Sequence, residues 1–151
     1  MIEPGSPAPD FSLIDQDGNE VSLSELLGTR VVLVFYPMDF SPACTDQLSL
    51  YQQAQPEFER RGARLYGISV DHAFAHKAFQ DHLGVSIPLL ADFEPRGEVA
   101  RAYDMYIASR GHNHRGFVVI DPEGGVSHWH RERTPLEIPA AERIIEALDA
   151  G

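Results

Sequence analysis

The chain of 151 residues contains a single cysteine, Cys44. One thiol cannot form an internal disulfide, a CxxC redox pair or a four-cysteine zinc site. If this cysteine has a chemical role, it therefore acts alone within its chain. Long apolar runs are also missing. The longest, residues 31–36, has the length of a strand and falls far short of the about 18 residues of a membrane-spanning helix.

Basic residues are scarce as well. Twelve lysines and arginines stand against 23 acidic residues, which gives a formal net charge of −11 at pH 7. A protein this negative repels phosphate backbones and anionic lipid, so we expect neither nucleic acid nor a membrane as a partner. Residues 1–10 carry acid and proline where a secretion signal would carry a basic stretch and an apolar block. We therefore expect a cytoplasmic protein.

The composition that remains is that of a globular chain, with 43% hydrophobic residues. Neither an internal repeat nor a linker divides it, so we expect one domain over residues 1–151. A hairpin around Asp17-Gly18 opens the chain. Strands are then expected over residues 30–36, 63–70, 87–90, 115–120 and 126–131. Helices are expected over residues 42–61, 71–82, 95–103 and 139–148. This alternation predicts an α/β fold with a central mixed sheet flanked by helices.

Some finer expectations follow from single residues. Pro56 lies inside the first long helical stretch and predicts a kink or break there. Asp71 is expected to cap the next helix. The proline at position 88 suits an edge strand or a first strand position. Six phenylalanines are expected to fill the core, namely Phe11, Phe35, Phe58, Phe74, Phe79 and Phe117.

The most informative segment is FYPMDFSPACT, residues 35–45. It joins the end of a buried strand to the start of a helix, where open α/β sheets bind ligands. Ser41 is a good N-cap and Pro42 a good first helical residue. Cys44 then falls in the first turn, where backbone N–H groups lack partners and the helix dipole is positive, so a thiolate is stabilised. A lone cysteine is just as often a small buried apolar residue, and its position alone leaves both interpretations open.

A second feature of the sequence is a positive island, a stretch that has basic but no acidic side chains. Residues 105–120 contain no acidic side chain, while Arg110, His112, His114 and Arg115 all lie there. Arg115 opens a strand expected in the same sheet as residues 30–36. A guanidinium at that point can reach the mouth of the helix and hold an anion or a polarised oxygen with forked donors. A solvated arginine paired with a carboxylate is the alternative.

The pattern Pro37-x-x-x-Ser41-x-x-Cys44 resembles the active-site signature of the peroxiredoxins, AhpC/TSA-like proteins of the thioredoxin-like superfamily. The likeness continues in order through GISVD (residues 67–71), FAHKAF (74–79), IPLLAD (87–92) and RGFVVID (115–121). It implies a thioredoxin-like fold and a thiol-dependent peroxidase that reduces hydrogen peroxide and organic hydroperoxides without a cofactor or metal.

The resemblance also implies a role for each matching residue. Cys44 would be the peroxidatic cysteine, which attacks the peroxide and becomes a sulfenic acid. Ser41 would hydrogen-bond the peroxide or the thiolate, and Arg115 would stabilise the thiolate and the charge that develops on the oxygens. Pro37 would shield the sulfur from water. Relatives commonly pair, so a homodimer is expected by analogy.

Two departures from the family pattern matter. Because no second cysteine exists, the chain resembles the one-cysteine type, in which an external thiol must reduce the sulfenic acid. A thioredoxin-like protein or a low-molecular-weight thiol could serve. Gln47 stands where many relatives carry a carboxylate, which makes the surroundings of Cys44 less negative.

Other interpretations stay open. The chain could be a thioredoxin-fold redox-sensing or binding protein whose cysteine is oxidised without efficient turnover. A Cys–His hydrolase is a weaker alternative, because no histidine is identified as a base held at the thiol. The histidines at positions 72 and 76 have a known metal spacing, and metal binding is also an alternative for the pairs at 112 and 114 and at 128 and 130. Packed or solvated side chains are favoured for each pair.

Overall fold

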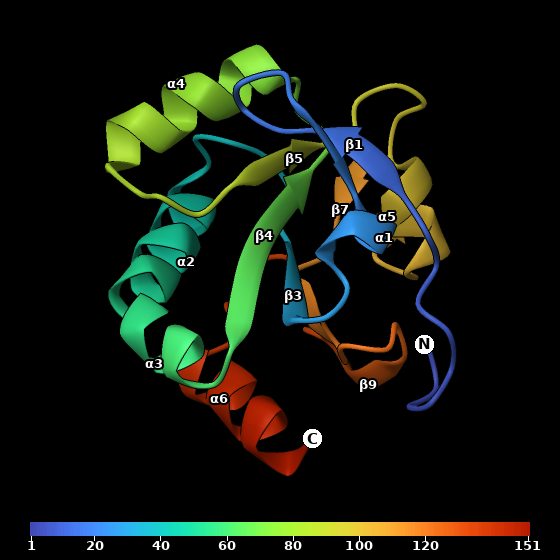
Figure 1. The fold of residues 1–151 in the computed structure, drawn as a ribbon. Coiled ribbons are helices and arrows are strands. Elements are labelled where there is room, and N and C mark those ends of the chain that lie inside the picture. Colours follow the sequence, from blue (N-terminus) through green and yellow to red (C-terminus); the bar gives the residue numbers. More distant parts are fainter.

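A computed structural model describes all 151 residues, with helices on both faces of a seven-stranded sheet (Figure 1). The elements are β1 (Ser12–Ile14), β2 (Glu20–Ser22), α1 (Leu23–Leu26), β3 (Arg30–Phe35), α2 (Pro42–Gln53), α3 (Gln55–Arg60), β4 (Ala63–Ser69), α4 (Ala73–Leu83), β5 (Leu89–Ala91), α5 (Glu98–Ala102), β6 (Tyr106–Ile107), β7 (His112–Asn113), β8 (Gly116–Ile120), β9 (Val126–Arg131) and α6 (Ala141–Ala150). None of these helices is both long and apolar enough to cross a bilayer.

The strands of the main sheet follow the order β2-β1-β5-β4-β3-β8-β9. Strand β3 runs parallel to β4 and antiparallel to β8, with Phe35 opposite both Ile68 and Gly116. The carboxyl ends of β3 and β4 therefore meet at the edge of the sheet where β8 begins. This edge brings together the segment after β3 and the residue just before β8, which is Arg115.

Alternate side chains of β3 enter two separate cores, as a strand covered on both faces requires. Val32 and Val34 pack with residues of α2, α3, α4 and α6 on one face of the sheet. Leu33 and Phe35 pack with residues of α1 and α5 on the other face. Figure 1 shows the same division, with α2, α3, α4 and α6 gathered on one side of the strands. The predicted α/β class and mixed sheet are confirmed.

Several local predictions are confirmed as well. Strands β1 and β2 form the N-terminal hairpin, and β8 and β9 form the hairpin near the C-terminus. The first long helical stretch breaks between Gln53 and Gln55, so that Pro56 lies in the first turn of α3, where its missing N–H costs nothing.

Other local predictions are wrong. Residue His72, not Asp71, is the N-cap of α4, because the Asp71 carboxylate already accepts bonds from the Asp39 N–H (2.7 Å) and the Ser69 hydroxyl (2.5 Å). Phe74 is 84% exposed, since it sits in the first turn of α4 with its ring against His72.

The strand expected over residues 87–90 begins two residues later as β5, and it lies inside the sheet between β1 and β4, not at an edge. Helices α5 and α6 begin three and two residues after their predicted starts. The short antiparallel pair of β6 and β7 was not predicted, because two-residue strands leave no periodic pattern.

Candidate active site

Cys44 lies in the first turn of α2, as the sequence predicts. Ser41 occupies the N-cap position with extended backbone angles (φ −71°, ψ 145°), and Pro42 is the first helical residue. The first intrahelical bond runs from the Thr45 N–H to the Ser41 carbonyl (3.0 Å). The N–H groups of Ala43 and Cys44 precede that bond, at the positive end of the helix.

The Ser41 side chain does not cap the helix, although its position was predicted correctly. Its hydroxyl donates to the Met38 carbonyl at 3.3 Å, and no backbone N–H of the first turn donates to it. Pro37 is buried two residues after Phe35, the last residue of β3. Both predicted residues therefore lie in the segment that leads from β3 into the helix that carries Cys44.

Arg115 reaches the same helix from the neighbouring strand. Its guanidinium is almost fully buried, with Nε donating to the Pro135 carbonyl and Nη1 donating to Oε1 of Gln47 at 2.7 Å. Gln47 is one turn after Cys44 on α2, so the cation lies along the helix face that bears the thiol. The predicted alternative of a solvated arginine paired with a carboxylate is wrong, because the partners are an amide and a carbonyl. Nη2 is used in neither bond.

A buried hydroxyl extends this contact. Gln47 Nε2 donates to the Tyr51 hydroxyl at 3.4 Å, and that hydroxyl donates to the Pro139 carbonyl at 2.7 Å. Burial raises the pKa of Tyr51 far above its ordinary value, so the group remains a neutral donor at every physiological pH. The chain from Arg115 through Gln47 to Tyr51 thus fixes the guanidinium against α2.

The thiol itself is enclosed. Cys44 has no exposed surface and belongs to the apolar cluster beneath α2, together with Val34, Tyr36 and Leu48. The sulfur is therefore not open to solvent in this conformation.

The sequence analysis missed a polar network under the same segment. Asp39 is buried between two partners, accepting from the Tyr36 hydroxyl at 2.7 Å through Oδ1 and contacting His76 Nδ1 at 2.8 Å through Oδ2. The second ring nitrogen of His76, Nε2, lies 3.0 Å from the Leu90 carbonyl oxygen. Burial, and then the charge of Asp39, raise the pKa of Tyr36 well above its ordinary value, so its hydroxyl keeps the hydrogen that it donates.

One feature of the sequence signals this network. His76 shares a helical face with the buried Ala73 and Phe79, at spacings of three residues. A polar side chain on an apolar helix face needs a buried hydrogen-bond partner. The sequence does not reveal that this partner is Asp39, because the two residues are 37 positions apart.

Asp39, Asp71 and His76 also offer three potential metal-ligand atoms within 4.8 Å of one another. Their hydrogen bonds argue against a metal, since both His76 nitrogens face acceptors and one Asp71 oxygen accepts two bonds. The sequence pair of His72 and His76 is not brought together as a ligand set. His72 accepts a bond from the Phe74 N–H at 3.4 Å and packs against Phe93.

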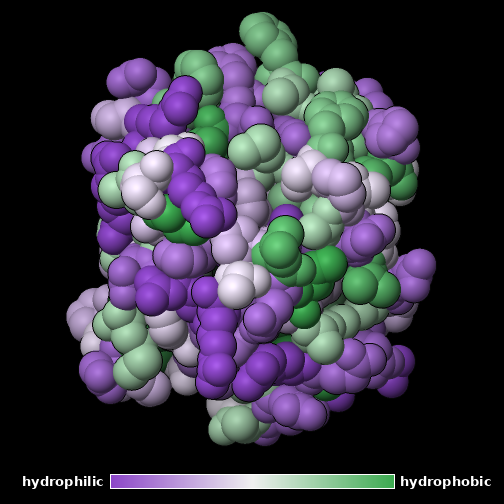
Figure 2. Space-filling model, turned by 180° about the vertical axis from the view of Figure 1, so that it is seen from behind, coloured by the Kyte–Doolittle hydropathy of each residue, from purple (hydrophilic) through white to green (hydrophobic).

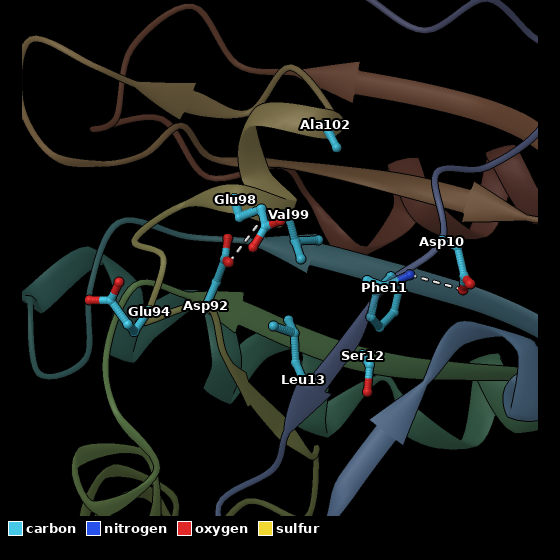
Figure 3. A pocket seen from close by; sticks show the side chains of 9 residues that line it. All are labelled: Asp10, Phe11, Ser12, Leu13, Asp92, Glu94, Glu98, Val99 and Ala102. Atoms are coloured by element: carbon cyan, nitrogen blue, oxygen red, sulfur yellow. Dashed lines mark hydrogen bonds between the residues drawn. The ribbon is translucent and has the colours of Figure 1, made fainter.

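A cavity of about 240 Å³ lies on the opposite face of the sheet, between β1 and α5 (Figure 3). Asp10, Asp92, Glu94 and Glu98 give it an acidic lining. The deepest of these carboxylates, Asp92, accepts the N–H groups of Val99 and Ala100 at the start of α5. The cavity therefore surrounds a structural helix cap and is separated by the sheet from Cys44.

Comparison with known proteins identifies what the chain resembles. A model of the AhpC/TSA family matches residues 4–129. The chain is 34% identical over 151 residues to the alkyl hydroperoxide reductase E of Mycobacterium tuberculosis, covering 99% of this chain and 98% of that protein. It is 43% identical over 151 residues to the chloroplastic peroxiredoxin Q of Oryza sativa subsp. japonica, covering 97% of this chain and 68% of that protein.

Solved structures show the same likeness. The peroxidoxin BcpB of Mycobacterium tuberculosis superimposes with a TM-score of 0.88 at 29% identity, over 99% of this chain and 98% of that one. The AhpC of Enterococcus faecalis gives a TM-score of 0.90 at 26% identity, over 99% and 92% of the two chains. The fold is therefore shared over 99% of the chain.

Proposed function

Since the chain belongs to the AhpC/TSA family of peroxiredoxins, which are thiol-dependent peroxidases, we propose that Cys44 is its peroxidatic residue and that Arg115, Ser41 and Pro37 complete the site. The observation that carries the assignment is the buried guanidinium of Arg115, bonded to α2 one turn after Cys44. The strand pairing supports this assignment, because it brings Arg115 and the N-terminus of α2 to one edge of the thioredoxin-like fold that the solved relatives share.

The reaction at this site forms one bond and breaks another. The Cys44 thiolate attacks one oxygen of hydrogen peroxide or an organic hydroperoxide, an S–O bond forms, and the O–O bond breaks. The attacked oxygen keeps its hydrogen, so the product is a sulfenic acid. The second oxygen leaves with the electron pair and takes up a proton to become water or an alcohol. Arg115 and the first-turn N–H groups stabilise the charge that develops on the oxygens.

The single cysteine requires a reductant from another molecule. A first external thiol attacks the sulfenic sulfur and releases water, which leaves a mixed disulfide on Cys44. A second thiol breaks that disulfide and restores the Cys44 thiol. A thioredoxin-like protein or a low-molecular-weight thiol would supply both. We propose the cytoplasm as the compartment, because such thiols are kept reduced there.

Mass spectrometry after one equivalent of hydrogen peroxide tests this function. We expect the protein to gain one oxygen atom at Cys44 and to lose it when a thioredoxin system or glutathione is added, with many turnovers. The Cys44→Ser variant serves as the control and should consume no peroxide. Oxidation that no thiol reverses over many cycles would favour the redox-sensing alternative, and cleavage of esters without peroxide consumption would favour a hydrolase.

We also propose that two copies pair through the edge that carries the site. Met38 and Phe40 are 41% and 52% exposed, so the segment before α2 presents two large apolar side chains at the surface. Figure 2 shows the molecule from behind, with apolar residues gathered in patches among hydrophilic ones. Sedimentation equilibrium should show a dimer, and Phe40→Glu should shift it toward the monomer.

A further inference from the structure

The hydrogen-bond partners of the buried His76 ring determine which of its nitrogens carry a hydrogen. Nδ1 of His76 faces the Asp39 carboxylate at 2.8 Å, and Nε2 faces the Leu90 carbonyl oxygen at 3.0 Å. A carbonyl oxygen only accepts, and so does an ionised carboxylate. The nearby Tyr36 hydroxyl, 3.5 Å from Nδ1, already gives its one hydrogen to Asp39. With Asp39 ionised, both ring nitrogens donate.

A histidine that donates from both nitrogens is an imidazolium. Asp39 is the natural counter-ion, because its Oδ2 lies 2.8 Å from His76 Nδ1. The charged groups near the ring are Asp39 from the segment after β3 and Asp71 from the end of β4. The titratable Tyr36 remains neutral, as its raised pKa requires. His76 is the one cation among them, with its side chain completely buried.

This ion pair anchors a strained part of the chain. Phe40 has a positive φ of 67°, a left-handed conformation that costs a residue with a side chain about 1–2 kcal/mol. Such strain persists only where the surroundings hold the backbone firmly. Asp39, the preceding residue, supplies that hold: its N–H donates to Asp71 at 2.7 Å, and its carboxylate is bound by Tyr36 and His76.

The strained residue directly precedes the N-cap. The direction in which the chain leaves Phe40 sets where Ser41 and the first turn of α2 lie, and with them the N–H groups around Cys44. Asp39 thus connects the ends of β3 and β4, through Tyr36 and Asp71, to the site, and His76 reaches it from α4. No other cationic group contacts this carboxylate.

We propose that His76 is a buried imidazolium whose ion pair with Asp39 positions the segment before α2 and thereby tunes the peroxide reactivity of Cys44. His76 is a positioning residue, because it acts through Asp39 and does not touch the thiol. The proposal rests on the proposed role of Cys44. Its chemical part, the charge of His76, can be tested without any activity.

The first measurement is a two-bond ¹H–¹⁵N spectrum of the histidine rings in the wild-type protein at pH 7. We expect both nitrogens of His76 to show the shifts of an imidazolium. The Asp39→Asn variant offers an amide N–H to Nδ1, so its His76 should show a neutral ring. A neutral His76 ring in the wild type at pH 7 would overturn the proposal.

The second measurement compares two reactions of Cys44 by stopped flow. His76→Phe removes both donors, and we expect peroxide oxidation to slow by about 10- to 100-fold, as displaced reacting groups do. Alkylation by iodoacetamide needs no aligned N–H groups and should stay the same or become faster. Asp39→Asn keeps the hydrogen bonds, so its loss should be smaller. Lys77→Gln, which removes an exposed cation from the next position of α4, is the control.

Each result decides one question. Wild-type peroxide rates in His76→Phe would overturn the positioning role, and so would parallel losses in both reactions. If His76→Phe does not fold, a double variant with Asp39→Asn and His76→Gln, in which both side chains are neutral, is measured in its place. The same outcomes then decide the question. A wild-type protein that consumes no peroxide would refute the proposed function instead, and the ring spectrum would still test the charge of His76.

Discussion

Replacing Arg115 is the sharpest test of the site, because its guanidinium makes two different contacts. Nε binds the Pro135 carbonyl and Nη1 binds Gln47. A hydrogen bond to a charged group contributes about 1.5–3 kcal/mol to stability. Arg115→Lys keeps the charge but can retain only one of the two contacts. Arg115→Ala loses both and leaves the buried Gln47 oxygen without its donor, so it should cost about 1–3 kcal/mol of unfolding free energy.

The effect on the reaction should exceed the effect on stability. Losing one preorganised donor to a developing negative charge slows enzymes by roughly 10²–10³-fold. We expect a loss of that size in Cys44 oxidation by hydrogen peroxide for Arg115→Ala, and an intermediate loss for Arg115→Lys. Stopped-flow fluorescence or competition against a second peroxidase measures the rate, and urea unfolding confirms the fold.

The exposed Arg110 from the same positive island is a matched control, and Arg110→Ala should react like the wild type. If Cys44 in Arg115→Ala is oxidised at the wild-type rate, Arg115 has no part in the mechanism. Equal losses in the two variants would show that overall charge matters and that the position of the guanidinium does not.

Three further predictions follow from single contacts. Gln47→Glu places a carboxylate against the Arg115 guanidinium, so alkylation of the thiol at pH 7 should slow about two- to fivefold; a faster reaction would contradict this. Gly116→Ala puts a methyl group against the His130 backbone oxygen, so urea unfolding should show a loss of about 1–3 kcal/mol. Burial raises the pKa of Asp92 above its ordinary 3.8, and the folded state therefore binds the proton more tightly. As the pH rises from 4 to 7, the wild type should lose stability relative to Asp92→Asn, whereas a constant difference would refute this assignment.

Sequence reasoning predicted the parts of the site that depend on neighbouring residues. The apolar run of β3, the proline at position 37 and the N-terminal signals of α2 act over a few residues, and they place Cys44 in the first turn. The strand pairing that brings Arg115 near followed from the order of elements and from the family likeness. These features need no knowledge of which distant side chains touch.

The features that sequence reasoning missed depend on such distant contacts. Asp71 looks like a helix cap beside α4, but the Asp39 N–H and the Ser69 hydroxyl occupy its carboxylate. Phe74 looks like a core residue, but it lies in the first turn of α4 on the solvent side. The buried bond between His76 and Asp39 joins α4 to the segment after β3, and only the folded chain shows it.

The uncapped N-terminus of α2 is where a local rule fails in an informative way. A serine at an N-cap normally accepts a bond from the second or third N–H of its helix. Here the Ser41 hydroxyl turns back to the Met38 carbonyl, and the N–H groups of Ala43 and Cys44 stay free of it. Such a helix start is less stable, but its donors remain available to a thiolate or a peroxide oxygen. Departures from local rules are expected at functional sites, where stability is given up for chemistry. The ion pair of His76 and Asp39 provides the compensation nearby, since it holds in place a segment that an ordinary cap would otherwise have stabilised.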